Sequence, residues 1–291
     1  MGSVVSAVIF DFYGTLAHFA DTEVSNYEAV FAAHGYTPER AVLDNYFSRY
    51  DGVEHTEHSA SEEAYEAWVR VRLRELTGAC GVPGPHVEDL VDALRASDQG
   101  PMVAYPEAAV TLSALRQAGL AIGVCSNWGW ELNGFLDEVG LLPLVDAGVT
   151  SARAGSRKPH PDIYGASVSA LGVDTADVVF VGDSWGPDVR GPRRIGMTAV
   201  HVWRQEERRG QSPPALEPGD YRVGDLMEVL QIVGNLRATR PANSERIGRP
   251  VRPWRDPDDK AVAEEGDFTG SPRQVARSRP GRRPTPPGRR R

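Results

Sequence analysis

Cysteine is scarce in this chain, and long apolar runs are missing from it. Its 291 residues include two cysteines, Cys80 and Cys125, which are too few for a disulfide framework and stand in no metal-ligand spacing. We interpret both as buried structural thiols. The apolar stretch near the N-terminus is too short to cross a membrane, follows no basic segment and has no cleavage site. We therefore expect a cytoplasmic protein without membrane contact.

The remaining composition is typical of a soluble protein, with 41% hydrophobic and 25% charged residues, and it suffices for a substantial core. The net charge of -8 is unevenly distributed, because residues 271–291 contain eight Arg and no acid. Proline and arginine replace apolar periodicity from residue 236 on, which predicts a disordered tail over 236–291. We expect this tail to be solvated, with a weak nucleic-acid contact through its arginines as the alternative.

Five short runs of Val, Ile and Ala show no polar alternation, as expected of strands buried on both faces of a parallel sheet. They cover residues 4–10, 120–126, 144–150, 177–183 and 198–203. Helical patterns over 106–119 and 160–172 alternate with these runs, and each pattern ends in Gly. The alternation predicts an α/β fold with a Rossmann-like, doubly wound parallel sheet.

Residues 18–98 interrupt this rhythm, because they contain no convincing strand. Helical patterns cover 22–34, 38–50, 61–81 and 86–97, and Ser61 and Glu63 suit the first turn of the third. A helical insert directly after the first strand would lie above the carboxyl edge of the sheet, where such sheets bind ligands. The sequence therefore predicts a helical cap over 18–98 and a catalytic core formed by 1–17 and 99–235.

Polar side chains follow the ends of several predicted strands. Because the carboxyl ends of parallel strands meet at one edge of a sheet, we expect these side chains to converge in one crevice. They are Asp11 after the first strand, Ser126 and Asn127 at the second, Lys158 before a helix, and Asp183 and Asp188 after the fourth.

The motifs "DFYGTL", "CSN", "RKPHP" and "GDSWGPDVRGPRRIGM" occur in this order along the chain. With the helical insert after the first motif, the chain resembles the haloacid dehalogenase-like hydrolase superfamily over about residues 4–205. The resemblance implies that Asp11 attacks an electrophile and forms a covalent aspartyl intermediate that water hydrolyses. It implies catalytic roles for Ser126, Asn127 and Lys158, with Ser126 donating a hydrogen bond and Lys158 supplying a fixed cation.

The resemblance also implies a Mg²⁺ site made of Asp11, Asp183 and the backbone carbonyl of Tyr13. Asp188 would bind the metal through water or orient Lys158. Thr15 would hydrogen-bond Asp11 or cap the segment that follows.

Tyr13 occupies the position at which phosphatases of this superfamily usually carry an aspartate that protonates the leaving group. A general acid of this kind contributes about 10²- to 10⁴-fold in rate. The arrangement "DFYGT" is similar to that of the 2-haloacid dehalogenases, whereas "GDSWGPD" is the metal-binding form of the fourth motif. We expect a Mg²⁺-dependent phosphoryl hydrolase acting on a small molecule with a good leaving group.

Two alternatives stay open. One is a metal-independent 2-haloacid dehalogenase in which Arg40 or Arg49 of the cap binds carboxylate or halide. The other is a catalytically weakened protein that serves as a binding or scaffold module. Aromatic side chains are candidates for the walls of the crevice, namely Trp128, Trp130 and Trp185. His18 is a candidate for a substitute general acid. The sequence predicts no particular oligomeric state.

Overall fold

The computed structural model describes residues 5–20, 26–48, 55–56, 61–97, 100–206, 208 and 210–239. All of them belong to one compact unit. The last described element is helix α10 (Met227–Thr239), which continues past residue 235, where the sequence analysis placed the end of the folded core. The prediction of a disordered tail lies outside the described residues from 240 on.

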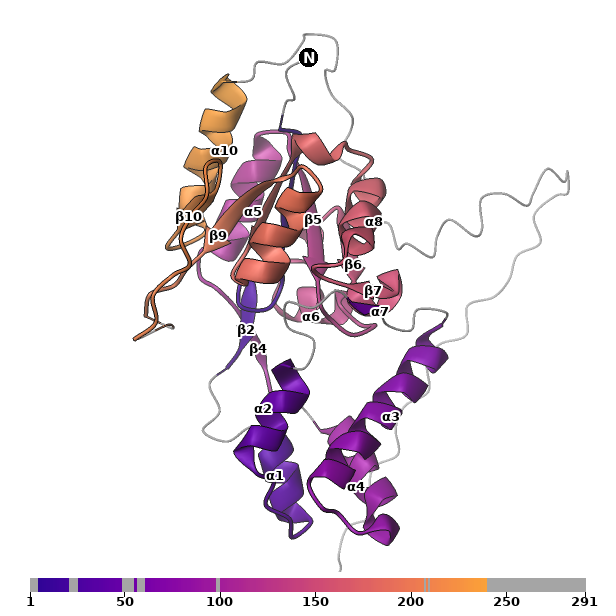
Figure 1. The fold of residues 1–291 in the computed structure, drawn as a ribbon. Helices are drawn as coiled ribbons and strands as arrows, with labels where there is room; N and C mark the ends of the chain where they lie inside the picture. Colours follow the sequence, from indigo (N-terminus) through magenta and orange to yellow (C-terminus); the bar gives the residue numbers. More distant parts are fainter. Residues whose placement is uncertain are drawn as a thin grey trace, which may run out of the picture. The chain divides into compact units, whose positions relative to one another are not determined.

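The predicted α/β fold is confirmed by a sheet of six parallel strands (Figure 1). Its order is β10-β9-β8-β1-β5-β6. The strands are β1 (Ala7–Phe10), β5 (Ala121–Ser126), β6 (Ala147–Thr150), β8 (Val178–Gly182), β9 (Thr198–Val202) and β10 (Tyr221–Val223). Strand β1 lies between β5 and β8, with Phe10 paired to Val124 on one side and to Val181 on the other.

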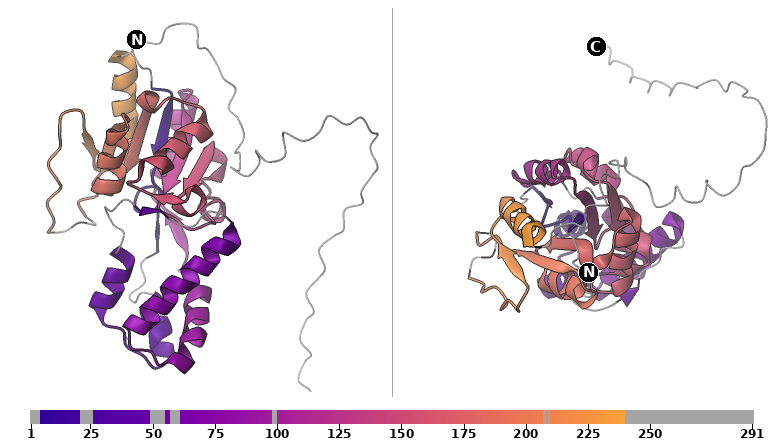
Figure 2. Two further views of the ribbon diagram at one scale, coloured as in Figure 1. Left: turned by 45° about the vertical axis from the view of Figure 1, so that its right-hand side comes forward. Right: turned by 90° about the horizontal axis from the view of Figure 1, so that it is seen from above.

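Helices cover both faces of this sheet, as the end-on view in Figure 2 shows. Successive residues of β1 point to opposite faces, so Val8 and Phe10 join one apolar core while Ala7 and Ile9 join another. Helices α5 (Ala108–Gln117) and α10 pack on the first face, and α8 (Pro161–Leu171) packs on the second. The remaining described helices of this region are α6 (Asn133–Glu138), α7 (Ser151–Ala154), α9 (Gly191–Arg194) and the π-helix η3 (Trp185–Arg190), and its 3₁₀ turns are η1 (Leu142–Leu144) and η2 (Thr175–Asp177).

The described part of residues 18–98, the range predicted to be helical, contains four helices. They are α1 (Asn26–Ala33), α2 (Arg40–Ser48), α3 (Glu62–Ala79) and α4 (Gly84–Ala96). Their apolar sides share a separate core that includes Phe31, Leu73 and Leu90. Ser61 caps α3 as expected, because its hydroxyl accepts a hydrogen bond from the Ala64 amide at 3.1 Å. None of the described helices is long and apolar enough to cross a membrane.

Two short strand pairs were not predicted. Strand β2 (Ala17–Phe19) pairs antiparallel with β4 (Met102–Ala104), and Figure 1 shows this pair between the six-stranded sheet and helices α1 to α4. Strand β3 (His55–Thr56) pairs antiparallel with β7 (Ser156–Arg157). Strands of two or three residues are too short to give a readable alternation in the sequence. The expectation that residues 18–98 contain no strand was therefore wrong.

The two cysteines differ in environment, although the sequence analysis treated both as buried. Cys125 lies within β5 and is fully buried, as predicted. Cys80 is only partly buried, because it caps the carboxyl end of α3, where the helix leaves its own apolar core. Both thiols are free.

Candidate active site

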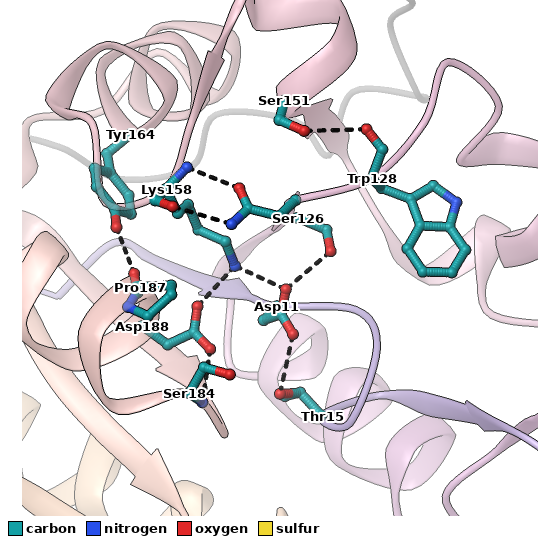
Figure 3. A network of polar contacts seen from close by, with 11 residues as sticks. Asp11, Thr15, Ser126, Trp128, Ser151, Lys158, Tyr164, Ser184, Pro187 and Asp188 are labelled. Atoms are coloured by element: carbon teal, nitrogen blue, oxygen red, sulfur yellow. Dashed lines mark hydrogen bonds and ion pairs between the residues drawn. The ribbon is translucent and has the colours of Figure 1, made fainter. Parts of the chain in front are cut away.

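Asp11 directly follows β1, the strand that lies between β8 and β5, and its backbone amide donates to the Val181 carbonyl at 2.9 Å. The residue is 6% exposed. Its carboxylate oxygen Oδ1 accepts hydrogen bonds from Ser126 Oγ at 2.9 Å and from Lys158 Nζ at 2.7 Å (Figure 3). From the described residues, Oδ2 receives one long contact of 3.5 Å, from Thr15 Oγ1. Two donors therefore hold one oxygen of Asp11 and leave the other more weakly engaged.

Lys158 is shared between two carboxylates. Its Nζ also donates to Asp188 Oδ1 at 2.7 Å, and the lysine side chain is 2% exposed. Burial opposes the charged form of this lysine, but Asp11 and Asp188 together raise its pKa above the usual value. Asp188 Oδ2 accepts from the Ser184 amide at 2.9 Å, which leaves Asp188 directed at Lys158. Asp188 was expected either to bind the metal through water or to orient Lys158. The structure shows the contact with Lys158 that the second role needs.

Asn127 contacts the backbone of Lys158. Its Nδ2 donates to the Lys158 carbonyl at 3.0 Å, and its Oδ1 accepts from the Lys158 amide at 2.7 Å. This pair of bonds joins the end of β5 to the segment after β7. Asn127 therefore positions the lysine, whereas Ser126 contacts Asp11 itself.

Asp183 follows β8 and completes a group of three carboxylates. Asp11, Asp183 and Asp188 each have a carboxylate oxygen that lies within 4.8 Å of those of the other two. Burial, and then the charge of Asp11, raise the pKa of Asp183 to about 6. Burial likewise raises the pKa of Asp188 to about 7, although Lys158 opposes this. The convergence expected from the strand ends is present.

Arg208 is a site residue that the sequence analysis missed. Its Nη2 donates to Asp183 Oδ2 at 2.7 Å and to the Asp183 carbonyl at 3.2 Å, while its guanidinium lies over the Trp203 ring at 4.8 Å. The residue belongs to the loop between β9 and β10. Its only signal in the sequence was the Arg-rich stretch "WRQEERRG" directly after a strand.

These charges fit a divalent cation. Three carboxylates face two cationic side chains, Lys158 and Arg208. Burial first, and the neighbouring carboxylates second, raise the pKa values of Asp183 and Asp188. Clustered carboxylate oxygens are the ligands that Mg²⁺ prefers.

Arg204, also missed from the sequence, fixes the turn after Asp11. Its guanidinium donates to the carbonyls of Gly14 and Thr15 at 3.0 and 3.2 Å, and to Glu107 Oε1 at 2.8 Å. Gly14 has a φ of 80°, and a Cβ at this position would lie 2.9 Å from the Asp183 carboxylate. The turn therefore requires glycine for two reasons: its backbone conformation disfavours other residues, and a side chain at this position would clash with the Asp183 carboxylate.

His201 supports Asp183 from the neighbouring strand. Arg222 Nε donates to His201 Nδ1 at 3.2 Å, and because an arginine donates only, His201 Nε2 carries the proton that is donated to the Asp183 carbonyl at 3.0 Å. Burial lowers the pKa of His201 to about 4, in agreement with a neutral ring. The ring packs edge-on between Trp185 and Trp203 at 5.3 and 5.5 Å.

Aromatic side chains gather beside Asp11. The ring centroids of Tyr13 and Phe19 are 5.5 Å apart, and both rings lie roughly parallel to Trp128, at 6.1 and 6.2 Å. Phe12 contacts Trp128 edge-on at 5.5 Å and is fully buried. Tyr13 is 46% exposed. Trp128 thus contacts Tyr13, the second residue after Asp11, and its expected role as a wall of the crevice stays a prediction.

Other residues considered for the crevice have different surroundings. Trp130 packs under the guanidinium of Arg153, and Trp185 packs on His201. His18 stacks on Tyr105 and therefore points to the opposite face of β2 from Phe19, because successive residues of a strand alternate. Arg40 is an exposed residue of α2 that pairs with Asp44 and Glu28, and Arg49 lies outside the described residues.

The site thus consists of a buried aspartate, paired with a lysine, that follows a central strand of a parallel sheet. The chain belongs to the haloacid dehalogenase-like hydrolase family, whose sequence model matches residues 5–196.

Similar proteins include two named phosphatases. The glyceraldehyde 3-phosphate phosphatase of Methanocaldococcus jannaschii is 28% identical over 46% of this chain and 58% of its own length. The phosphoserine phosphatase of Thermus thermophilus is 34% identical over 58% of this chain and 68% of its own length. The matches thus span only part of each of these relatives.

Among solved structures, an L-2-haloacid dehalogenase superposes with a TM-score of 0.54 at 25% identity, covering 80% of this chain and all of that one. The family contains both kinds of enzyme, and both resemble this chain.

Proposed function

We propose that this protein is a Mg²⁺-dependent phosphatase that acts on a small molecule with a good leaving group. The observation that carries the proposal is the cluster of Asp11, Asp183 and Asp188, whose carboxylate oxygens lie within 4.8 Å of one another. Lys158 forms ion pairs with both Asp11 and Asp188, and Asp183 adds a third negative charge. Phosphatases among the similar proteins agree with this assignment.

Asp11 is the proposed nucleophile. Ser126 and Lys158 hold its Oδ1, so Oδ2 is the oxygen that attacks phosphorus. Lys158 then offsets negative charge on the aspartyl phosphate, and water attacks the phosphorus to release phosphate and restore the carboxylate. Asn127 keeps Lys158 in place throughout, through its two bonds to the lysine backbone.

Asp11, Asp183 and the backbone carbonyl of Tyr13 would hold Mg²⁺, with Asp188 placed behind Lys158. A bound Mg²⁺ neutralises phosphoryl oxygens and thereby stabilises the charge of the transition state. Arg204 and Gly14 shape the turn that carries the Tyr13 carbonyl past Asp183.

Helices α1 to α4 act as the cap in this proposal. The pairing of β3 with β7 places His55 opposite Arg157, the residue before Lys158, so the helical segment contacts the core next to the site. The two free thiols agree with a cytoplasmic location, where thiols stay reduced.

The test is phosphate release from acetyl phosphate and 4-nitrophenyl phosphate, with and without Mg²⁺. We expect release that needs both Mg²⁺ and Asp11, so that Asp11→Asn is inactive. The matched control is Asp162→Asn, an exposed aspartate in the first turn of α8, which should keep full activity. Absence of phosphate release from the folded wild-type protein would refute the proposal.

Hydrolytic dehalogenation of a 2-haloacid is the second candidate, and the pair Arg208–Asp183 favours it. Arg208 supplies a cation for Asp183 without a metal, and halide leaves without a proton, so Tyr13 in place of an acid carries no penalty. In this reaction Asp11 attacks carbon and the carbon–halogen bond breaks. Chloride release from 2-chloropropionate in the presence of a metal chelator, lost in Asp11→Asn, would favour this candidate over the phosphatase.

A further inference from the structure

We propose that the aromatic cluster of Tyr13, Phe19 and Trp128 binds an aromatic leaving group, so that the substrate is an aryl phosphate. This inference rests on the proposed phosphatase function and specifies its substrate class. The Trp128 ring lies roughly parallel to Tyr13 and to Phe19, at interplanar angles of 26° and 29°, while those two rings are tilted by 46° to each other; the centroid separations are 5.5 to 6.2 Å. Offset or stacked rings at such separations attract one another, and another aryl ring can join them.

The cluster lies next to the nucleophile because of where its members stand in the chain. Tyr13 is the second residue after Asp11, and Trp128 is the second after Ser126, whose hydroxyl donates to Asp11 Oδ1. The indole lies on the Ser126 side of Asp11, away from Lys158 (Figure 3). The leaving group of a phosphoryl ester bound at Asp11 would therefore have an aromatic surface on the side opposite the lysine.

The backbone of Trp128 is held independently of its ring. Its carbonyl accepts from Ser151 Oγ at 3.2 Å and from the Ala152 amide at 3.3 Å. Phe12 is fully buried and contacts the indole ring edge-on. An aromatic wall with a fixed backbone and a fixed supporting ring is pre-organised for binding.

A cavity of about 530 Å³ has one lining residue, Phe135, in contact with the aromatic cluster. Phe135 contacts Trp128 edge-on at 5.3 Å, whereas Tyr13, Phe19 and Trp128 are not among the lining residues. Val69 and Leu94 of the helical segment supply apolar surface to it. The volume falls within the range of about 300 to 1,000 Å³ that is typical of small-molecule pockets.

An aryl leaving group also explains how the reaction proceeds with Tyr13 in place of an acid. A phenol has a pKa of about 10, whereas an alkanol resembles water, at about 15.7. An aryloxide can therefore leave without prior protonation. Asp11 Oδ2 attacks phosphorus, the phosphorus–oxygen bond to the aryl group breaks, and the aryloxide takes the electron pair and later a proton from solvent. Water then cleaves the aspartyl phosphate to give phosphate and free Asp11.

The test compares kcat/KM for 2-naphthyl phosphate and for acetyl phosphate in the full chain. For Trp128→Ala we expect the ratio of naphthyl to acetyl activity to fall about tenfold, because only the naphthyl substrate uses the stacking surface. Phe19→Leu, which keeps bulk but removes the ring, should lower the same ratio severalfold. Trp130→Ala is the matched control, because Trp130 packs against Arg153 and should leave the ratio unchanged.

The experiment can refute the aryl site and the phosphatase function independently of each other. If acetyl phosphate is hydrolysed and the ratio is the same in all variants, the aryl site is refuted and the phosphatase function stands. If neither substrate is hydrolysed, the phosphatase function fails, and calorimetric binding of 2-naphthyl phosphate decides on the aryl site. Binding at least tenfold weaker in Trp128→Ala than in wild type and Trp130→Ala supports it, and equal binding overturns it.

Discussion

Arg208 donates to Asp183 Oδ2 at 2.7 Å, so a carboxylate of the proposed metal site already has a cationic partner from the β9–β10 loop. Any divalent cation must share Asp183 with this guanidinium or displace it. We therefore expect Arg208→Gln to bind Mg²⁺ about tenfold more tightly than wild type, which corresponds to about 1.4 kcal/mol. Calorimetric titration of the purified protein with Mg²⁺, without substrate, measures this change directly.

Arg193→Gln is the control for this prediction. Arg193 pairs with Glu217 and Asp220 at 2.9 and 3.0 Å, so its removal deletes a cation of similar exposure that does not contact Asp183. Its Mg²⁺ affinity should match that of wild type. Equal affinity in Arg208→Gln and Arg193→Gln would show that Arg208 does not compete with the metal.

Gly14 and Gly35 share a φ of 80° but differ in surroundings, which makes them a matched pair. A Cβ on Gly35 has nothing within 4 Å, whereas one on Gly14 would lie 2.9 Å from the Asp183 carboxylate. Gly35→Ala should therefore lower the free energy of unfolding by about 1 to 2 kcal/mol, the backbone penalty alone. Gly14→Ala should lower it further and also weaken Mg²⁺ binding. Urea unfolding and the titration check both effects, and identical behaviour of the two variants would contradict the packing argument.

The location of the clustered carboxylates followed from the sequence, because it depends on topology alone. Residues that end parallel strands meet at one edge, so Asp11, Ser126 and Asp183 had to converge once the strands were recognised. Arg204 and Arg208 belong to a segment without periodicity, and their partners lie as far away as Gly14, so no local pattern could assign them. Long-range contacts of loop side chains depend on the path of the chain, which the sequence pattern does not encode.

The same limit explains the aromatic residues. Three tryptophans were equivalent as candidates for the crevice wall, and of these Trp128 has a ring contact with Tyr13 in the structure. Trp130 lies two residues further and stacks with Arg153, while Trp185 packs on His201. The direction of a side chain after a strand depends on turn geometry, and this differs after β5 and after β8.

Lys158 balances two buried carboxylates, so its removal should be strongly destabilising. Lys158→Met leaves Asp11 and Asp188 facing one another without their shared cation, and we expect a loss of about 3 to 5 kcal/mol in the free energy of unfolding. The double variant Lys158→Met, Asp188→Asn also removes the negative charge of Asp188, so it should recover part of the lost free energy of unfolding. Urea unfolding of wild type, both single variants and the double variant forms a complete cycle. Strictly additive effects would show that the two side chains do not interact energetically.

Cys125 should make stability depend on pH in the alkaline range. Burial raises the pKa of its thiol to about 12, although Lys158 lowers it, whereas the unfolded chain ionises near the ordinary value of 9.0. A raised folded-state pKa gives stability that is complete below pH 9 and is lost as pH rises toward 12, by roughly 1.4 kcal/mol per pH unit. Cys125→Ala lacks this loss, so the stability advantage of wild type over this variant should shrink between pH 9 and 11.

Urea unfolding at pH 8, 9, 10 and 11 in reducing buffer measures this advantage. Cys80→Ala is the control, because Cys80 is only partly buried at the end of α3 and its ionisation in the folded protein is less restricted. The difference between wild type and Cys80→Ala should therefore change less over the same interval. If the wild-type and Cys125→Ala stability curves ran parallel from pH 8 to 11, the Cys125 thiol would ionise equally in the folded and unfolded chains, and its proposed desolvation within β5 would be wrong.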